Sequence, residues 1–292
     1  MRVLNIGSLN YDYVYDVDHI VKGGETIASN GMQVFCGGKG LNQSIALAKA
    51  GVAVYHAGLI GEDGDRFIEL CSTFGVDTTY LQKMNGKSGH TIIQVDANGQ
   101  NSIILFGGTN QMLTKEYIDE VLSNFTCGDI LLLQNEVNEL AYIIEQGYRI
   151  GLQIILNPSP MNSKLMECDL SKVSVFMINE IEGEQLTKET EPDRILSSLR
   201  NQFPNAKVVL TLGAKGVMYQ DHEVTIYQES MKVKVTDTTA AGDTFTGYFI
   251  AGMLEGLPME DVLLLCTKAC GITVTRKGAA ASIPLRQEVQ IN

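Results

Sequence analysis

Short apolar runs alternate with stretches of helical, amphipathic spacing along almost the whole chain. The apolar runs are typical of buried strands, and we expect strands at residues 51–58, 129–134, 154–157, 175–178 and 207–212. Residues 64–74 and 139–151 have the spacing of helices. Buried strands of Val, Ile and Leu that alternate with helices predict an α/β fold, with a mostly parallel central sheet covered on both faces.

Two segments depart from this rhythm, because their apolar and polar residues alternate one by one. In residues 9–18 the odd positions are apolar or tyrosine and the even positions are mostly polar, which indicates a strand with one buried face and one solvent-exposed face. Residues 89–96 and 101–106 flank the turn at 97–99 and predict a hairpin of the same kind. We therefore expect a small antiparallel sheet, a lid made of residues 10–36 and 88–107, on a body of residues 1–9, 37–87 and 108–292.

Composition narrows the function classes. The chain has 292 residues, 45% of them hydrophobic, which is enough for a large core. Its 34 acidic and 22 basic residues give a net charge of −12, which disfavours a nucleic-acid partner. No apolar run approaches the ~20 residues that span a bilayer, and the N-terminal run is too short for a signal peptide. The six scattered cysteines form no CxxC pair, so we expect reduced thiols in a soluble, cytoplasmic protein without a membrane partner.

The strongest chemical motif lies in residues 237–247, just before an apolar helical run. Ala240, Ala241 and Gly242 are small enough for the backbone to approach a ligand, and the N-terminus of the following helix favours an anion. Asp243 has two interpretations. It either caps the helix or takes part in a reaction, since a carboxylate would otherwise repel a phosphate bound beside it.

A second glycine-rich motif covers residues 36–43 and leads into an alanine-rich helix. Within it, Lys39 and Asn42 are able to reach hydroxyl groups or an anion. Two other nucleotide motifs are excluded: residues 86–88 lack the earlier glycine of a P-loop, with Leu81 in its place, and no GxGxxG follows the first strand. A dehydrogenase is therefore disfavoured, and the four histidines lie in unrelated segments that support no hydrolytic triad.

These two motifs, in this order, resemble the signatures of the PfkB family of carbohydrate kinases, and within it the ribokinase group. Further matches cover nearly the whole chain, at residues 7–12, 23–26, 156–160, 179–182, 211–216 and 275–278. The resemblance implies a three-layer, ribokinase-like α/β body with a lid over a sugar site. It also implies ATP-dependent phosphorylation of a primary hydroxyl of a small sugar, with D-ribose the first candidate.

Residue roles follow from this resemblance. The catalytic base matches Asp243, and the backbone amides around it, from Ala240 through Ala241 and Gly242, match the group that holds the developing charge. The positions that match the sugar contacts of the family are Asn10, Asp12, Gly38, Lys39, Asn42, Glu136 and Asp243. Asn10 and Asp12 are two residues apart on a strand, so they share a face, whereas Tyr11 points to the opposite side.

For the nucleotide, the resemblance implies contacts from Asn179, Thr211, Gly213, Lys215, Gly216, Gly242 and Thr267. Glu182 matches a Mg²⁺ position that acts through water, although Asn179 and Glu182 also have the spacing of a capping box. The family also binds a monovalent cation, usually K⁺. The matching positions are Asp237, Thr239, Thr273, Arg276, Gly278 and Ser282.

Several alternatives remain open from the sequence. A kinase of fructose, a sugar acid or an adenosine-type nucleoside would share this fold, and a non-catalytic sugar- or nucleotide-binding protein is a less favoured reading. The tyrosine-rich face of the lid needs a partner. In ribokinases two lids pack together, which implies a homodimer, while the alternative is a lid folded onto its own body.

Overall fold

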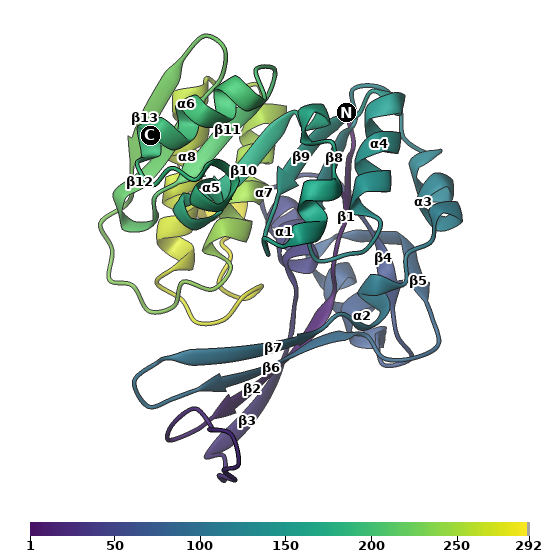
Figure 1. Ribbon diagram of the computed structural model, residues 1–292, viewed down its shortest axis with the longest axis vertical. Helices are drawn as coiled ribbons and strands as arrows, with labels where there is room; N and C mark the ends of the chain where they lie inside the picture. Colours follow the sequence, from purple (N-terminus) through teal and green to yellow (C-terminus); the bar gives the residue numbers. More distant parts are fainter. Residues whose placement is uncertain (291–292) are drawn as a thin grey trace.

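Nine strands form the main sheet of the computed structural model, which describes residues 1–290 (Figure 1). Their order across the sheet is β13 (Thr225–Glu229), β12 (Gly216–Gln220), β11 (Lys207–Thr211), β10 (Val175–Asn179), β9 (Gln153–Asn157), β8 (Ile130–Gln134), β1 (Val3–Ile6), β4 (Val54–Ile60) and β5 (Asp77–Lys83). All neighbours are parallel except β11–β12 and β12–β13. The predicted α/β fold with a mostly parallel sheet is confirmed.

One predicted strand begins later than expected. The run at residues 51–58 contributes β4 only from Val54, because its first residues close the preceding helix α1 (Lys39–Lys49). Gly51 has a φ of +89°, and the N–H of Val52 donates to the carbonyl of Leu47 at 3.0 Å. This is the usual way in which a glycine ends a helix, so residues 51 and 52 are lost to the strand.

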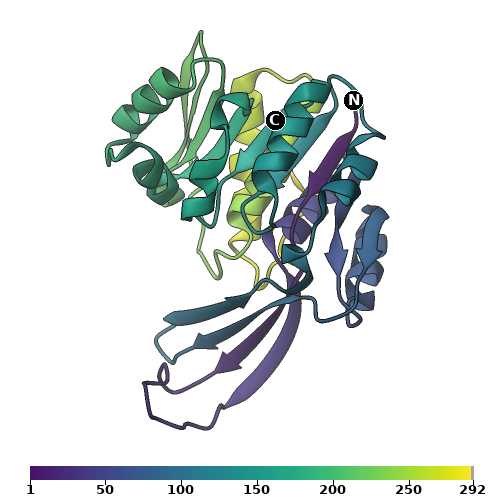
Figure 2. The same cartoon turned by 45° about the vertical axis from the view of Figure 1, so that its right-hand side comes forward.

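Helices cover both faces of the main sheet, as Figures 1 and 2 show. One hydrophobic core packs α1, α2 (Asp65–Phe74), α7 (Ala241–Leu254) and α8 (Met259–Thr273) against the sheet. A second core on the other face packs α3 (Lys115–Leu122), α4 (Leu140–Ile150), α5 (Glu180–Thr187) and α6 (Pro192–Gln202). Short 3₁₀ segments lie at Gly108–Gln111, Ser163–Glu167, Leu170–Lys172, Gly213–Lys215 and Arg286–Glu288. Among the described residues, none of the helices has the length and apolar character needed to cross a bilayer.

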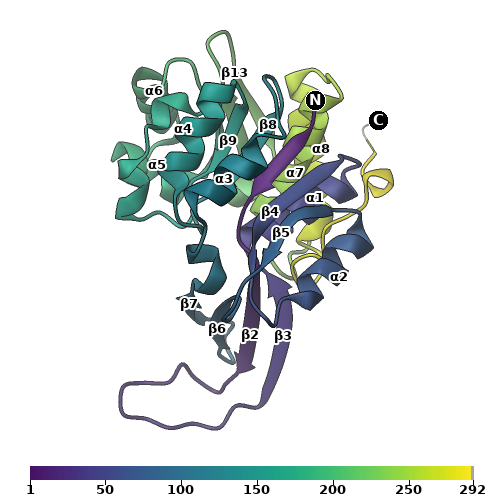
Figure 3. The ribbon, with the colours of Figure 1, turned by 90° about the vertical axis from the view of Figure 1, so that its right-hand side faces the viewer.

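A four-stranded sheet projects from one end of the body (Figure 3). It consists of β3 (Gly31–Gly37), β2 (Asn10–Asp16), β6 (Gly89–Val95) and β7 (Asn101–Phe106), in that order. The outer pairs are antiparallel as expected, but β2 and β6 run parallel, so the prediction of a wholly antiparallel sheet was wrong there. Both strands leave the body at their first residue, and Asn10 is paired with Gly89, which forces them to run in one direction.

Tyr11 anchors this projecting sheet to the body. Its ring lies 4.3 Å from that of Phe67 on α2, and its hydroxyl donates to the carbonyl of Asp63 at 2.6 Å. Its neighbours Asn10 and Asp12 therefore point to the other face of β2, as the alternation in the sequence predicts.

Candidate active site

The small residues before α7 form an open helix N-terminus. Ala240 precedes the helix with a left-handed φ of 60° and makes no side-chain cap. The N–H of Ala241 donates to the carbonyl of Thr238 at 3.2 Å, whereas those of Gly242 and Asp243 meet no acceptor within residues 1–290. Two unpaired N–H groups at the positive end of a helix form a site for an anion.

Asp243 is not the helix cap. It lies in the first turn of α7 and is buried, with 8% of its surface exposed. Its Oδ2 accepts a hydrogen bond from Nδ2 of Asn42 at 3.2 Å, and its Oδ1 accepts one from Nε2 of Gln43 at 2.9 Å. The capping interpretation was therefore wrong, and the carboxylate is held by the second glycine-rich motif.

The close approach of helices α1 and α7 brings these groups together. A Cβ atom at Gly247 on α7 would lie 2.5 Å from the Cβ of Ala46 on α1, so no side chain fits between the helices there. Asp243 and Asn42 lie one turn earlier on the same two helices. At this spacing, short amide side chains reach the carboxylate directly.

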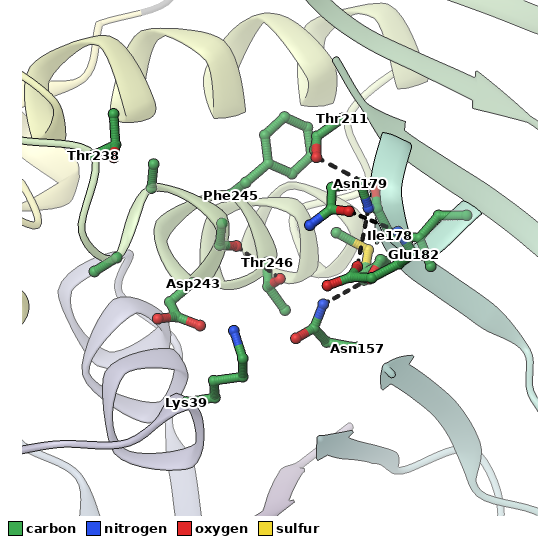
Figure 4. A pocket seen from close by; sticks show the side chains of 14 residues that line it. Lys39, Asn157, Ile178, Asn179, Glu182, Thr211, Thr238, Asp243, Phe245 and Thr246 are labelled. Carbon is green, nitrogen blue, oxygen red and sulfur yellow. Dashed lines mark hydrogen bonds between the residues drawn. The ribbon is translucent and has the colours of Figure 1, made fainter. Parts of the chain in front are cut away.

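Lys39 points into the cavity beside Asp243 (Figure 4). Burial alone would lower the pKa of Lys39, but the carboxylates of Asp243, Glu136 and Glu182 raise it above the ordinary value. The ammonium group is therefore charged and compensates for carboxylates that approach it from different elements. The cavity is about 240 Å³, and its lining includes Lys39, Asn157, Asn179, Glu182, Thr211, Thr238, Phe245, Thr246 and residues 240–243.

Glu136 follows β8 and holds the glycine-rich loop. Its Oε2 accepts hydrogen bonds from the hydroxyl of Ser8 and from the N–H of Lys39, the latter at 2.9 Å. Burial raises the pKa of Glu136, against the hydrogen bond from Ser8 and the charge of Lys39. Glu136 thus lies beside the loop at residues 37–40, where its carboxylate already has partners within the protein.

Asn10 and Asp12 lie at the root of the projecting sheet and continue this polar region. Asn10 Oδ1 accepts from Nδ2 of Asn110 at 2.7 Å, and Asp12 Oδ1 accepts from the hydroxyl of Thr91 at 2.6 Å. Burial raises the pKa of Asp12, partly opposed by that hydroxyl. A Cβ at Gly38, which has a φ of +93°, would lie 3.1 Å from the backbone N of Asn10, so the loop joins this pair to Lys39.

Asn179 and Glu182 form the capping box that their spacing predicts. The N–H of Glu182 donates to Asn179 Oδ1 at 2.9 Å, and the N–H of Asn179 donates to Glu182 Oε2 at 3.0 Å. Burial raises the pKa of Glu182, opposed by the N–H of Asn179 and by Lys39. Both residues also line the cavity, so the cap and a role in a site coexist.

A second cavity of about 660 Å³ adjoins the first and is more apolar. The two share Thr211, Thr238, Ala241, Gly242 and Phe245. Among the predicted nucleotide contacts, the lining of the second cavity includes Thr211, Gly213, Gly216, Gly242 and Thr267. Lys215 is not among them: its side chain is 73% exposed, with Nζ 3.5 Å from Oε1 of Glu180. A polar chamber joined to an apolar one suits a ligand with an anionic tail and a flat apolar ring.

The residues expected around a monovalent cation are only partly gathered. Asp237 Oδ1 accepts from the N–H of Thr239 at 2.9 Å, and Oδ2 accepts from the N–H of Gly278 at 2.9 Å. The hydroxyl of Ser282 donates instead to the carbonyl of Ala279 at 2.7 Å. The hydroxyl of Thr273 lies 3.1 Å from that of Thr244, and the side chain of Arg276 pairs with Glu288 at 2.6 Å. Within residues 1–290, no group of three or more Asp, Glu, His or Cys residues is arranged to hold a metal.

Two residues at the site were not singled out from the sequence. Gln43 touches Asp243, and Asn157 lines the first cavity while its Nδ2 donates to the carbonyl of Met177 at 2.8 Å. Both lie inside segments that match the family, at residues 36–43 and 156–160. A polar residue at the carboxyl end of a buried parallel strand, as at Asn157, is a signal that could have identified it.

Comparison with known proteins agrees with this geometry. The family described as pfkB family carbohydrate kinase matches residues 2–286. The ribokinase of Haemophilus influenzae is 34% identical over 97% of this chain and 95% of its own length. The deoxyribokinase of Salmonella typhimurium is 31% identical over 97% of this chain and 96% of its own. The solved structure of Arabidopsis thaliana ribokinase complexed with ribose and ATP is similar with a TM-score of 0.86 and 30% identity, over 99% of this chain and 97% of that one.

Proposed function

The chain belongs to the pfkB family of carbohydrate kinases, as its glycine-rich motifs predicted, and we propose that it phosphorylates D-ribose with ATP to give ribose 5-phosphate. The observation that carries this proposal is the place of Asp243. Its carboxylate lies next to the unpaired N–H groups of Gly242 and Asp243 and faces Lys39, where the polar cavity begins. A base and an anion site in contact are what phosphoryl transfer to an alcohol requires.

In this proposal Asp243 orients the primary hydroxyl of the sugar and accepts its proton. A carboxylate is a weak base beside an alcohol, so the proton transfer comes late, as the hydroxyl oxygen bonds to phosphorus. The N–H groups of Gly242 and Asp243 and the ammonium group of Lys39 stabilise the charge on the transferred phosphoryl group. The protein acts mainly by positioning the two substrates and by stabilising charge, as is usual for phosphoryl transfer.

The polar region at the root of the projecting sheet is the proposed sugar site. Asn10, Asp12, Asn42 and Glu136 offer acceptors and donors to sugar hydroxyls, with Gly38 and Lys39 in the loop between them. Because Asn110 already donates to Asn10 Oδ1, the Nδ2 group of Asn10 is left for the sugar. Support for ribose comes from the ribokinase relatives and from the Arabidopsis thaliana ribokinase solved with ribose and ATP.

The joined cavities are the proposed nucleotide site. The phosphates lie in the polar chamber near Asn179 and Thr211, and the adenine ring lies in the apolar chamber near Thr267. Gly213 and Gly216 line the wall between β11 and β12 and let the backbone approach the ribose of ATP. We assign no phosphate contact to Lys215, because its side chain is exposed and paired with Glu180.

Two cations complete the proposal. Carboxylate and amide oxygens of Glu182 and Asn179 suit Mg²⁺ held mostly through water, and the ion would neutralise phosphate charge. For a monovalent cation such as K⁺, Asp237 has suitable chemistry: burial raises its pKa, but hydrogen bonds from Thr239 and Gly278 lower it below the usual value. Equal rates in K⁺, Na⁺ and tetraalkylammonium buffers would count against the monovalent site.

We also propose a cytoplasmic homodimer that pairs through the projecting sheet. The six cysteines are free thiols, which suits a reducing compartment. Ile103, Ile104, Leu105 and Phe106 on β7 are each about half exposed or more, and Phe35 is exposed on β3, the opposite edge strand of the same sheet. An apolar surface of this kind favours burial against a second copy. Sedimentation as a monomer at micromolar concentration would argue for a lid that stays on its own body.

The test is an assay of ADP release from ATP and Mg²⁺ over a panel of acceptors, with and without K⁺. The panel contains D-ribose, 2-deoxyribose, fructose, a sugar acid and adenosine, and the control is Asp243→Asn, which should lose most of kcat. 2-Deoxyribose is the second candidate substrate, because the deoxyribokinase of Salmonella typhimurium is 31% identical to this chain. Higher kcat/KM for ribose than for every other acceptor supports the proposal, and sugar binding without ADP release would indicate a non-catalytic protein.

A further inference from the structure

We propose that a buried chain of side chains, running from Asp243 through Gln43 and Gln134 to Asn5, holds the Asp243 carboxylate in its working orientation. This inference rests on the proposed role of Asp243 as the base. Gln43 and Gln134 are each 1% exposed and Asn5 is fully buried, and none of them lines either cavity. They are therefore positioning residues, which act on the substrate only through Asp243.

The hydrogen bonds of this chain have one consistent direction. A carboxylate only accepts, so Gln43 must turn its Nε2 toward Asp243 Oδ1, 2.9 Å away. Its Oε1 then faces Gln134 and accepts from Nε2 of that residue at 2.6 Å. The same Nε2 group of Gln134 also donates to Oδ1 of Asn5 at 3.1 Å. A flip of Gln43 would place two acceptor oxygens against each other at Asp243 and two N–H donors against each other at Gln134.

The direction continues beyond Asn5. Because Oδ1 of Asn5 accepts, its Nδ2 donates to the carbonyl of Gly40 and to the hydroxyl of Ser44, both at 2.8 Å. The hydroxyl of Ser44 is then free to donate to Nδ1 of His56 at 2.7 Å, and Nε2 of His56 donates to the carbonyl of Gly7 at 3.3 Å. The orientation of each amide in the series follows from the carboxylate at one end, and that of the Ser44 hydroxyl follows from the neutral imidazole at the other.

These side chains come from rigid parts of the molecule. Asn5 and Gln134 belong to the adjacent central strands β1 and β8, whose other residues are apolar and buried. Polar groups at such positions cost stability unless their hydrogen bonds are made, and within residues 1–290 Oε1 of Gln134 has no partner. The protein thus has polar residues at positions in the core of the sheet where apolar residues would pack without needing hydrogen bonds. What the polar residues provide is a fixed link from the sheet to the base.

The test compares Gln134→Met and Gln43→Met with the matched control Gln220→Met. Gln220 is also a buried glutamine whose Oε1 has no partner, but it lies on β12 and bonds to Thr225. Because misplacement of a reacting group costs up to about a hundredfold in rate, we expect kcat to fall roughly tenfold or more in the first two variants. KM for the sugar and affinity for ADP should stay close to wild type, and the control should keep its kcat.

A double variant shows whether the effect passes through the carboxylate. Added to Asp243→Asn, Gln43→Met should change the residual rate little, since the group that it positions is already gone. An equal loss in both backgrounds would overturn the inference, as would a folded Gln134→Met protein with wild-type kcat. If Asp243→Asn itself keeps normal turnover, the proposed base is wrong instead.

A measurement that does not depend on turnover tests the positioning of Asp243 separately from its proposed role as the base. Crystal structures of the wild-type protein and of Gln134→Met should show one conformer of Gln43 and Asp243 in the first, and rotated or multiple conformers in the second. An unchanged Asp243 in the variant would overturn the inference even if no acceptor sugar were found.

Discussion

A Cβ atom added at Gly37 would lie 2.0 Å from Oδ2 of Asp12. These residues belong to paired strands, β3 and β2, and the Asp12 carboxylate lies directly over the Gly37 backbone. The missing side chain is thus what allows Asp12 to turn toward the loop at residues 37–40 while it accepts from Thr91. The proposed sugar site thus depends on a glycine, which has no side chain of its own to reach a sugar.

Gly37→Ala should therefore weaken sugar binding. The added methyl group displaces the Asp12 carboxylate, and the loss of a charged hydrogen bond should raise the sugar KM roughly tenfold to a hundredfold. Steady-state kinetics and calorimetric titration of the sugar measure this. The control is Gly31→Ala at the other end of β3, where a Cβ meets nothing within 4 Å. Equal sugar affinity in the two variants would contradict the placement of Asp12 in the site.

Lys39 and Lys215 should behave differently although both lie in motifs that match the family, Lys39 at a sugar contact and Lys215 at a nucleotide contact. Lys39→Met removes the positive charge that Asp243, Glu136 and Glu182 surround, so kcat/KM should fall by about a hundredfold or more. Lys215→Met removes an exposed charge 3.5 Å from Glu180 and should cost no more than about fivefold. ADP-release kinetics with each purified variant decide the matter. A larger loss for Lys215→Met would restore the phosphate contact that the resemblance implied.

Local spacing explains which site features could be predicted from the sequence. The capping box of Asn179 and Glu182 lies within one helical turn, so its geometry follows from the residue types alone. The free helix N-terminus at residues 240–243 is equally local, since small residues before an apolar helical run leave its N–H groups open.

Other features depend on how distant segments meet. Gln43 and Asp243 are 200 positions apart, and their contact arises only from the packing of α1 against α7. The parallel pairing of β2 with β6 depends on where both strands leave the body. Lys215 lies at the position that the motif predicts. Its long, flexible side chain is nevertheless exposed to solvent and paired with Glu180, outside the cavity. The spacing of residues along the sequence does not predict any of these three arrangements.

Gly247→Ala should separate α7 from α1. Alanine favours a helix over glycine by about 1 kcal/mol, but the new methyl would lie 2.5 Å from Ala46, so we expect a net loss of about 1–3 kcal/mol in the free energy of unfolding. The wider spacing should also reduce kcat by lengthening the contacts of Asp243. Gly252→Ala in the same helix is the control: its Cβ would meet Val262 at 3.1 Å, and it should change stability by less than about 1 kcal/mol. Urea denaturation that ranks the variants in the opposite order would refute the close packing.

His56 should make the fold sensitive to mild acid. Its imidazole is fully buried, and burial lowers its pKa from 6.5 to about 4. Below pH 6.5 the unfolded chain binds a proton at this residue that the folded chain does not. The free energy of unfolding should therefore fall by about 1.4 kcal/mol per pH unit toward pH 4 through this residue alone. Stability from His56 is complete at neutral pH and is lost as the pH decreases.

The measurement is urea denaturation of wild type and His56→Asn at pH 7.5 and pH 5.0. Asparagine keeps an acceptor near Ser44 but cannot titrate, so the wild type should lose about 2 kcal/mol more than the variant between these pH values. Asp12, Glu136 and Glu182 titrate in both proteins, and the comparison cancels their contribution. Parallel pH dependence in the two proteins would mean that His56 accepts a proton in the folded state. The hydroxyl of Ser44 would then accept from His56 instead of donating to it, since a protonated Nδ1 donates, while the amides between Asn5 and Asp243 would keep the orientation that the carboxylate sets.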